Sequence, residues 1–182
     1  MTTSYASYPE ARQHGAAHGH RYWFGVPRPV DIHYHRAITP AGYLTASAQD
    51  MAHYLVAQLN GGSYAGARVL SAQGVAAMHR PQISATLMGA TTGYGMAWDS
   101  RDMSGVKVII DAGDNLAFRA DTILIPGGNW GVVVLQNAND FTNGARIAAI
   151  SSGVVSLLAA GQQPPATGGQ AQHGWLCGHS SV

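Results

Sequence analysis

The sequence predicts an α+β fold in which an antiparallel sheet is flanked by helices. Three apolar segments rich in β-branched residues, Val106–Ile110, Phe118–Ile125 and Trp130–Leu135, follow one another closely and are typical of strands. The turn residues 126–129, Pro-Gly-Gly-Asn, join the second segment to the third, so these two are expected to pair as an antiparallel hairpin. Helical patterns stand before and after this block, which favours α+β over alternating α/β.

The clearest helical pattern begins after Ser47, whose side chain suits an N-cap, with Asp50 three residues further on. Asn60-Gly61-Gly62 ends it. A weaker helix begins at Ser71 and ends before Pro81. The apolar positions of the first helix recur with helical spacing and give it one apolar face: Met51, Tyr54, Leu55 and Leu59.

A final helix is predicted over residues 140–159, capped by Asp140 or Thr142 and packed across one face of the sheet. The remaining segments carry weaker signals. We predict an irregular segment over residues 1–40 with a short helix at Pro9–Ala17, a loop over 82–93, a short extended stretch at Tyr94–Trp98, a turn at Asp99–Gly105, and a disordered Gly/Gln/Pro-rich tail over 161–182.

Composition excludes several classes of function. Charged residues make up 10% of the chain and the net charge is +1, with Lys107 the single lysine, so no basic surface is predicted for a nucleic acid partner. The sequence has no run of 18 apolar residues, so no membrane span is predicted. The polar N-terminus does not resemble a signal peptide. Cys177 is the single cysteine, which rules out a disulfide within the chain.

The best candidate site lies at the end of the first predicted strand, at Asp111, Ala112, Gly113 and Asp114. Short polar residues and glycine at a strand end allow backbone N–H groups to point into a cleft. Five histidines in the first 35 residues could suggest a metal site. No carboxylate or cysteine is arranged with them, so we predict neither a metal nor a cofactor.

Several motifs occur together in an order and spacing that resemble a known family. The chain resembles the C-terminal half of the serine β-lactamase-like hydrolases, which are related to penicillin-binding proteins and class C β-lactamases, over a domain of residues 1–160. The motifs are PAGYLTASAQDM at 40–51, LNGG at 59–62, VLS at 69–71, YGMAW at 94–98, and P at 126 followed by WGVVVLQN at 130–137.

The resemblance implies a helical region beside an antiparallel sheet of about five strands built from both chain ends. An N-terminal helix and two strands of the family fold would lie beside Trp130–Leu135. That run reads as a central strand buried on both faces, yet this chain supplies partners on one side of it. We therefore expect an incomplete sheet, with an exposed apolar edge that allows self-association.

The family's chemistry uses three motifs: S-x-x-K with the nucleophilic serine, Y-x-N or S-x-N, and K-T-G or H-x-G on a strand. By position the third falls on Asp111-Ala112-Gly113. Gly113 matches, whereas Asp111 replaces a cation that helps to bind an anionic substrate group. The resemblance makes the N–H of Asp114 the strand's donor to the oxyanion.

The other two motifs are absent from their expected places. Ser104-Gly105-Val106-Lys107 fits the letters S-x-x-K, but it lies in a predicted turn before a strand, where residues i and i+3 point to opposite faces. No Tyr or Ser is followed two residues later by Asn. We therefore expect no acyl-enzyme chemistry from this chain alone.

Two hypotheses follow from the resemblance. The first is a serine hydrolase that transfers an acyl group from an amide or ester, such as a peptide, a β-lactam or a small ester, once the site is completed. The second is a non-catalytic binding or interaction module that retains the cleft, which Asp111 in place of a cation favours. Family members work mostly outside the cytoplasm, whereas this chain has no export signal.

Overall fold

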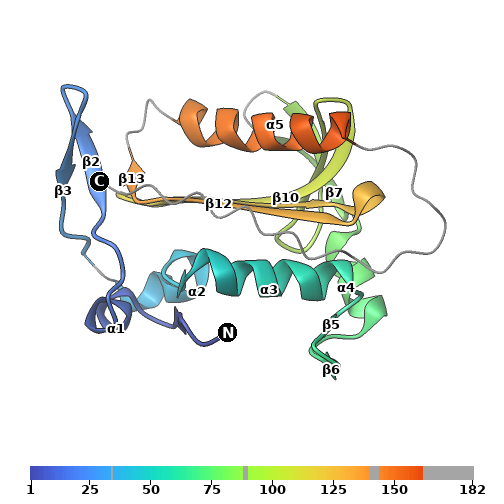
Figure 1. The fold of residues 1–182 in the computed structure, drawn as a ribbon, viewed down its shortest axis with the longest axis horizontal. Helices are drawn as coiled ribbons and strands as arrows, with labels where there is room; N and C mark the ends of the chain where they lie inside the picture. The colour runs from blue at the N-terminus through green and yellow to red at the C-terminus, as the bar shows by residue number, and fades with distance from the viewer. Residues whose placement is uncertain (34, 88–89, 140–143, 162–182) are drawn as a thin grey trace.

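The computed structural model describes residues 1–33, 35–87, 90–139 and 144–161. Its centre is an antiparallel six-stranded sheet with the strand order β12-β11-β10-β9-β8-β7. Figure 1 shows this sheet between two long helices, α3 (Ala48–Leu59) on one face and α5 (Gly144–Ala160) on the other. The strands are β7 Ile83–Leu87, β8 Ala90–Tyr94, β9 Asp99–Met103, β10 Val106–Asp114, β11 Arg119–Ile125 and β12 Trp130–Gln136.

The α+β class and the three predicted central strands are confirmed. The predicted number of main strands, three, was too low, because the sheet has six. Residues 82–93 form the hairpin β7–β8 rather than a loop, and the predicted turn at 99–105 contains β9. Strand β8 ends at Tyr94, so residues 95–98 are not a strand. Strands β8 and β9 are rich in polar residues, which hides the apolar alternation that marks a half-buried strand, whereas β7, Ile-Ser-Ala-Thr-Leu, does alternate and was overlooked.

The β9–β10 hairpin also has a local signal that the sequence prediction missed. Its two central residues, Ser104 and Gly105, both have positive φ values, 54° and 77°. Such a pair suits a two-residue hairpin because its twist matches that of the strands. Met103 and Val106 pair on either side of it.

The N-terminal region is more regular than predicted. Helix α1 (Tyr8–Gln13) overlaps the predicted helix but begins one residue earlier and ends four residues earlier, and β2 (His20–Trp23) and β3 (Val26–Pro29) form a hairpin. A short strand, β13 (Ala138–Asn139), pairs parallel to β2 and joins this hairpin to the end of the main sheet. The smaller elements are β1 Ser4–Tyr5, β4 Thr45–Ala46, β5 Ser63–Tyr64, β6 Ala67–Arg68, α2 Thr39–Gly42, α4 Ala72–His79, η1 Arg36–Ile38 and η2 Pro126–Gly128.

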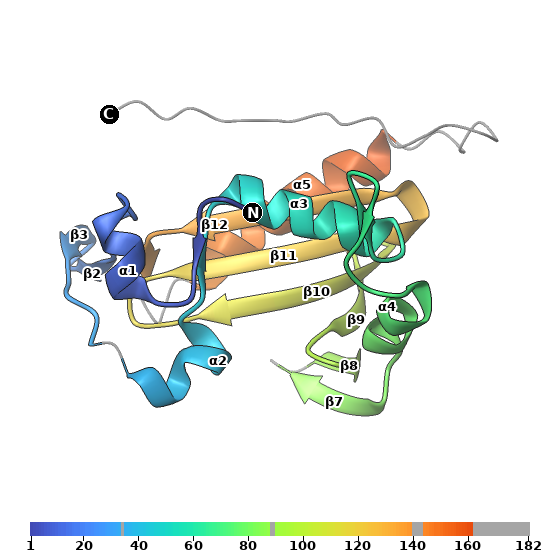
Figure 2. The same ribbon diagram turned by 90° about the horizontal axis from the view of Figure 1, so that it is seen from below.

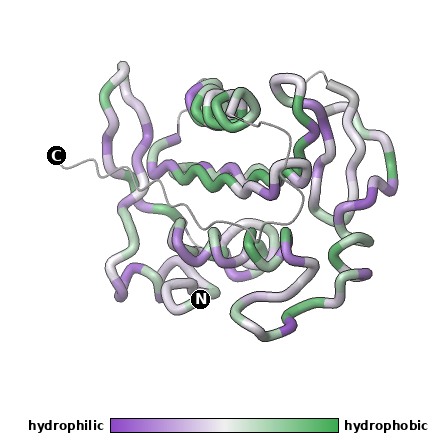
Figure 3. The backbone as a smooth tube through the Cα atoms, turned by 45° about the vertical axis from the view of Figure 1, so that its right-hand side comes forward, coloured by the Kyte–Doolittle hydropathy of each residue, from purple (hydrophilic) through white to green (hydrophobic). Residues whose placement is uncertain are grey.

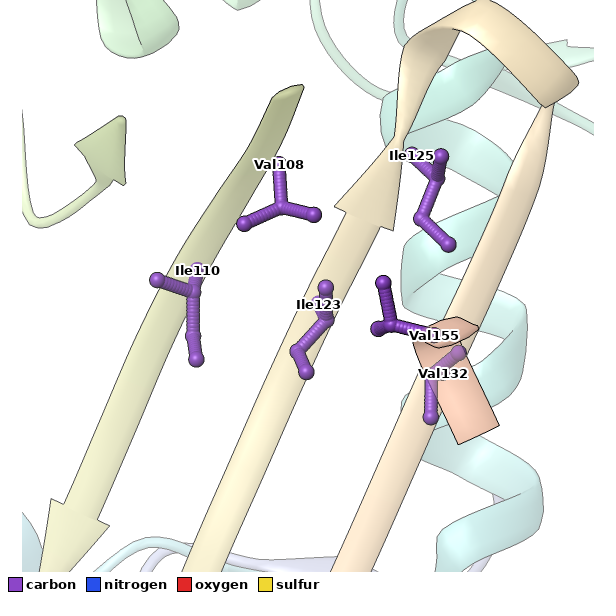
Figure 4. Packing of buried hydrophobic residues seen from close by; sticks show 6 residues of the cluster. All are labelled: Val108, Ile110, Ile123, Ile125, Val132 and Val155. Carbon is purple, nitrogen blue, oxygen red and sulfur yellow. The ribbon is translucent and has the colours of Figure 1, made fainter. Parts of the chain in front are cut away.

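The core lies on both faces of the sheet. Val155 of α5 packs on one face against a cluster shown in Figure 4: Val108, Ile110, Ile123, Ile125 and Val132. On the other face, Leu55 of α3 packs against Trp98 and Leu124. Figure 3 shows the hydrophobic stretches concentrated in the sheet and in the helix above it. Side chains alternate between the two faces of a strand, so successive apolar residues of β10 and β11 lie alternately on the α5 side and the α3 side of the sheet.

Strand β12 is an edge strand, because β11 is its one partner in the sheet. Helices α3 and α5 both contact it, and Val132 in its middle is buried. Trp130 and Leu135 near its ends are 37% and 42% exposed, so the predicted burial of the whole run on both faces is wrong. The continuous apolar sequence is typical of a central strand, but among the described strands β12 has a partner on one side only.

The predicted caps of α3 and α4 are confirmed. The Ser47 Oγ accepts a hydrogen bond from the Asp50 N–H at 3.1 Å, and the Ser71 Oγ accepts one from the Gly74 N–H at 2.9 Å. Both serines are extended residues that satisfy a free N–H group of the first helical turn. The residues proposed to cap α5, Asp140 and Thr142, lie outside the described residues, as does the predicted tail beyond residue 161.

The Asp50 carboxylate clamps the N-terminal segment. It is buried and accepts hydrogen bonds from the Thr2 and Thr3 N–H groups at 3.2 and 2.8 Å and from the Ser4 Oγ at 2.8 Å. Desolvation would raise its pKa, but these hydrogen bonds outweigh it and hold the pKa at about 2. They keep β1 beside β4, so this one carboxylate fixes the start of the chain on α3.

A second buried carboxylate joins α5 to the sheet. Asp121 of β11 is 7% exposed and Ser151 of α5 is 1% exposed, and the Ser151 Oγ donates to the Asp121 carboxylate at 2.6 Å. A polar pair inside an apolar interface fixes the register of the helix on the sheet, because any shift leaves both groups unpaired.

Among the described helices, none combines the length and the apolarity that a bilayer span needs.

Replacing Ser151 by Ala should destabilise the fold by about 1–3 kcal/mol, because Asp121 loses its buried donor. Urea unfolding followed by circular dichroism measures the change. The matched control is Ser156→Ala on the same helix, where the exposed hydroxyl donates to Ser104; it should change stability by less than about 0.5 kcal/mol. Equal losses in the two variants would show that the Asp121–Ser151 pair does not hold α5.

Replacing Asp50 by Asn should destabilise the chain at neutral pH, and the difference from the wild type should shrink in acid. The folded pKa of about 2 lies below the ordinary value of 3.8, so the carboxylate stabilises the fold above the higher value and loses this effect as the pH falls through the lower one. Urea midpoints between about pH 7 and about pH 2 measure this. Asp31→Asn, at an exposed carboxylate, is the control; a constant Asp50→Asn difference across this range would contradict the clamp.

We expect the chain to self-associate through the free edge of β12. Among the described strands β12 has no partner on this side, so backbone groups along its seven residues, none of which carries a charged side chain, are left unpaired by the sheet. Sedimentation velocity at tens of micromolar should detect dimers or larger species. Leu135→Lys should abolish them, whereas Leu157→Lys, at a 77% exposed position on α5, should not. A wild-type monomer at this concentration would refute association through this edge.

Candidate functional site

An open pocket of about 880 Å³ lies where the N-terminal segment meets the ends of β10, β11 and β12. Its walls come from five parts of the chain: residues 3–17, Ile32, residues 40–51, the end of β10 with the start of β11, and residues 135–137. Figure 1 shows why these parts meet, since α1, α2 and the start of α3 all lie under the same end of the sheet. A concave site at one sheet edge is the usual place for a ligand.

The sequence-predicted residues fall on β10 as it enters this pocket. Asp111, Gly113 and Asp114 line the pocket, whereas Ala112 does not. Side chains alternate along the strand, and Val108 and Ile110 pack towards α5 while Ile109 packs towards α3. Asp111 and Gly113 therefore lie on the α3 side and Ala112 on the α5 side.

The backbone of residues 111–114 has a free edge. Strand β10 pairs with β11 over residues 109–114 but with β9 over 106–110 only. Beyond Ile110 the second side of β10 has no ladder partner among the described strands, and Figure 2 shows the strand running past β9 and β8 towards α2. An extended segment of a ligand could pair with this edge through main-chain hydrogen bonds.

Asp111 is an uncompensated carboxylate. Among the described residues it makes no hydrogen bond and no ion pair, and its partner across the ladder is the neutral Thr122. Its side chain opens to solvent through the pocket, yet the surrounding walls desolvate it and raise its pKa. Burial also raises the pKa of Tyr54 on α3, the Gln58 side chain lowers it, and the charge of Asp111 raises it further. Tyr54 therefore stays a neutral neighbour of this carboxylate.

Asp114 has a different environment although it lies three residues away. Its carboxylate accepts from Arg119 Nη2 at 2.6 Å and from Asn139 Nδ2 at 2.5 Å, and Arg119 Nε donates to Asn139 Oδ1 at 2.7 Å. Asn139 is fully buried. The three side chains form a closed network in which both charges are paired, so the Asp114 side chain holds the structure together and is not free for a ligand.

Asn115 fixes the turn between β10 and β11. Its Oδ1 accepts hydrogen bonds from the N–H groups of Ala117 and Phe118 at 3.0 and 2.9 Å, and its carbonyl oxygen accepts from Asn139 Nδ2. No local sequence motif marks Arg119 or Asn139. Asn139 contacts Asp114, Asn115 and Arg119 across 20 or more residues, and Arg119 meets Asp114 through the register of the β10–β11 hairpin.

The described residues that line the pocket include a single serine, Ser47. Ser104 lies in the β9–β10 turn, at the opposite end of β10 from the pocket, and its hydroxyl accepts a hydrogen bond from Ser156 Oγ at 2.7 Å. No lysine is found among the described pocket-lining residues. The lining hydroxyl of Ser47 caps α3 and contacts Thr3 Oγ1 at 2.7 Å, so it serves the structure.

The histidines occupy separate positions. His14 lines the pocket and stacks on Tyr5 with ring centroids 4.9 Å apart, His18 contacts Arg12, and His79 packs edge-on against Trp98. Burial lowers the pKa of His79. Within the described parts of the chain, no three His, Cys, Asp or Glu side chains gather as metal ligands would.

Comparisons with solved structures show the fold. The octameric penicillin-binding protein homologue from Pyrococcus abyssi superposes with a TM-score of 0.74 at 23% identity, covering 88% of this chain and 34% of that one. A β-lactamase from Sulfitobacter sp. EE-36 gives 0.67 at 19% identity, covering 88% and 50% of the two chains. A class C β-lactamase from Rhodobacter sphaeroides gives 0.66 at 18% identity, covering 87% and 50%.

The chain thus spans between a third and a half of the length of these solved structures. No curated protein sequence matches it. The family model described as Beta-lactamase matches residues 1–153, which is most of the 182-residue chain. The predicted resemblance is confirmed, and the chain belongs to the β-lactamase family.

Proposed function

We propose that this chain forms the substrate-binding wall of a serine β-lactamase-like acyl-transfer site. The observation that carries the proposal is the free edge of β10 at residues 111–114, which opens onto the 880 Å³ pocket. An amide or ester substrate lying along this edge would pair its backbone groups with those of β10. The ordered turn fixed by Asp114 and Asn115 keeps the edge rigid, which preorganises it for a ligand.

In the proposed reaction a serine hydroxyl attacks the substrate carbonyl and transfers its proton to a nearby base. The carbonyl oxygen becomes an oxyanion, to which the backbone N–H of Asp114 donates. The bond to the leaving amine or alcohol then breaks as that group takes up the proton, and water later releases the acyl group. The lining residues do not supply the serine or the base, so these come from a segment outside the described pocket.

A second candidate function is a binding module without chemistry. Asp111 favours it, because the position that resembles a cation site in related hydrolases carries a negative charge here. The two functions differ in one respect that can be read without a structure, namely whether coding DNA upstream of Met1 holds an in-frame S-x-x-K and Y-x-N. If it does, the extended chain should react with a serine-directed fluorophosphonate probe; if it does not, binding is the better proposal.

Residues 1–182 alone should not hydrolyse a chromogenic β-lactam or a p-nitrophenyl ester above background, because the described lining residues include one serine, the helix-capping Ser47, and no lysine to act as its base. Absorbance assays measure this, with a class C β-lactamase as the positive control. The chain should also resist stoichiometric labelling by a fluorophosphonate. Labelling at Ser104 would show that the S-x-x-K letters at 104–107 form a working site, and labelling elsewhere would reveal a nucleophile outside the described pocket.

A further inference from the structure

We propose that the pocket binds a ligand with a positively charged group, an ammonium or guanidinium, placed at Asp111. The inference deepens the proposed function, since it names the class of substrate that the β10 edge would accept. It predicts an amide or peptide with a cationic end rather than an anionic one. Three features carry it: an unpaired carboxylate, the absence of an available cation among the described lining residues, and aromatic walls.

The first feature is the charge of Asp111. The Asp111 side chain is exposed and lines the pocket, and it has no ionic partner among the described residues. Lys107 lies on the same side of β10 but about 13 Å away along the strand, opposite Asp102 of β9. Tyr54 approaches from α3 and is neutral, and Thr122 lies across the ladder. A cationic ligand would supply the missing partner.

The second feature is the state of the other charged groups in the pocket. Arg119 is the one arginine or lysine among the described lining residues, and its Nε and Nη2 atoms donate to Asn139 and Asp114. His14 lies across the pocket, stacked on Tyr5. An anionic ligand on the β10 edge would therefore meet the carboxylate of Asp111 without a free arginine or lysine to offset the repulsion.

The third feature is the composition of the walls. Four aromatic residues line the pocket: Tyr5, Tyr8, Tyr43 and Phe118. Tyr8 and Phe118 form an edge-to-face pair with ring centroids 5.7 Å apart, which leaves ring surface within the pocket. Aromatic faces attract cations and also pack against the apolar body of a ligand. The walls thus suit an amine-bearing ligand with an apolar or aromatic side chain.

The free strand edge supplies the direction of binding. A ligand amide that pairs with residues 111–114 would run antiparallel or parallel to β10 and so place one end beside Asp111. The other end would lie towards Asp114 and the Asn115 turn. In this arrangement Asp111 would pair with the charged group of the ligand, while the strand edge would form hydrogen bonds with the ligand's backbone.

Three probes that share one body test the proposal: alanyl-phenylalanine amide, which is cationic, its neutral N-acetyl derivative and its anionic N-succinyl derivative. Binding to residues 1–182 is measured by isothermal titration calorimetry or by NMR line shifts. The cationic probe should bind about tenfold more tightly than the neutral one, as expected for a hydrogen bond to a charged group. The anionic probe should bind more weakly still.

Asp111→Asn should reduce the preference for the cationic probe to nearly onefold, and Asp111→Lys should make the succinyl derivative the best of the three. Asp102→Asn removes the same charge at an exposed position on β9 and should keep the tenfold preference. Thermal melts of the three variants confirm that each one is folded. Equal binding of the free amine and its acetyl derivative, an unchanged preference in Asp111→Asn, or no binding of any probe at millimolar concentration would overturn the proposal.

The outcome is separable from that of acyl transfer, because binding needs no nucleophile. A cationic preference together with an extended chain that resists fluorophosphonate would leave this inference standing and remove the hydrolase proposal. Fluorophosphonate labelling together with no charge preference would do the opposite.

Discussion

The structure depends on the ladder in which β11 pairs with β10 on one side and with β12 on the other. Three consecutive residues of β11 are buried: Ile123, Leu124 and Ile125. Their side chains point alternately to the two faces of the sheet, so Ile123 and Ile125 lie on the α5 side and Leu124 lies on the α3 side. The polar half of the same strand, at Arg119 and Asp121, then reaches the pocket end of the sheet and the Ser151 contact. One strand thereby joins the two cores to the candidate site.

The same ladder explains why two aspartates three residues apart differ in their use. Asp114 lies where β10 turns into β11, so Arg119 stands directly opposite it and pairs with it. Asp111 lies opposite Thr122 of β11. On its other side it has no β9 partner, because the pairing of β10 with β9 stops at Ile110. The register of the hairpin pairs one carboxylate with a cation and leaves the other facing an open pocket. A shift of one residue would turn both side chains to the other face of the sheet.

Sequence patterns predicted the parts of the fold that local signals determine. The Ser47 and Ser71 caps, the Pro-Gly-Gly-Asn turn and the apolar strands were all identified, because each rests on neighbouring residues. The strands β7, β8 and β9 were missed, since each depends on pairing with its neighbour in the sheet, β9 with β10, β8 with β9 and β7 with β8. Asp50 was noted only as the residue three positions after the Ser47 cap. It binds Thr2 and Thr3, across 47 or more residues, which a local pattern cannot reveal.

The candidate site was predictable as a place but not as a set of contacts. Gly113 and the short polar residues beside it marked the strand end, whereas the pairing of Arg119 and Asn139 with Asp114 required the three-dimensional arrangement. Among the described strands, two of the open edges of the sheet differ in chemistry. The edge of β12 is apolar along its length and suits another polypeptide strand. The edge of β10 is short, carries a lone carboxylate and borders aromatic rings, so it suits a small charged ligand.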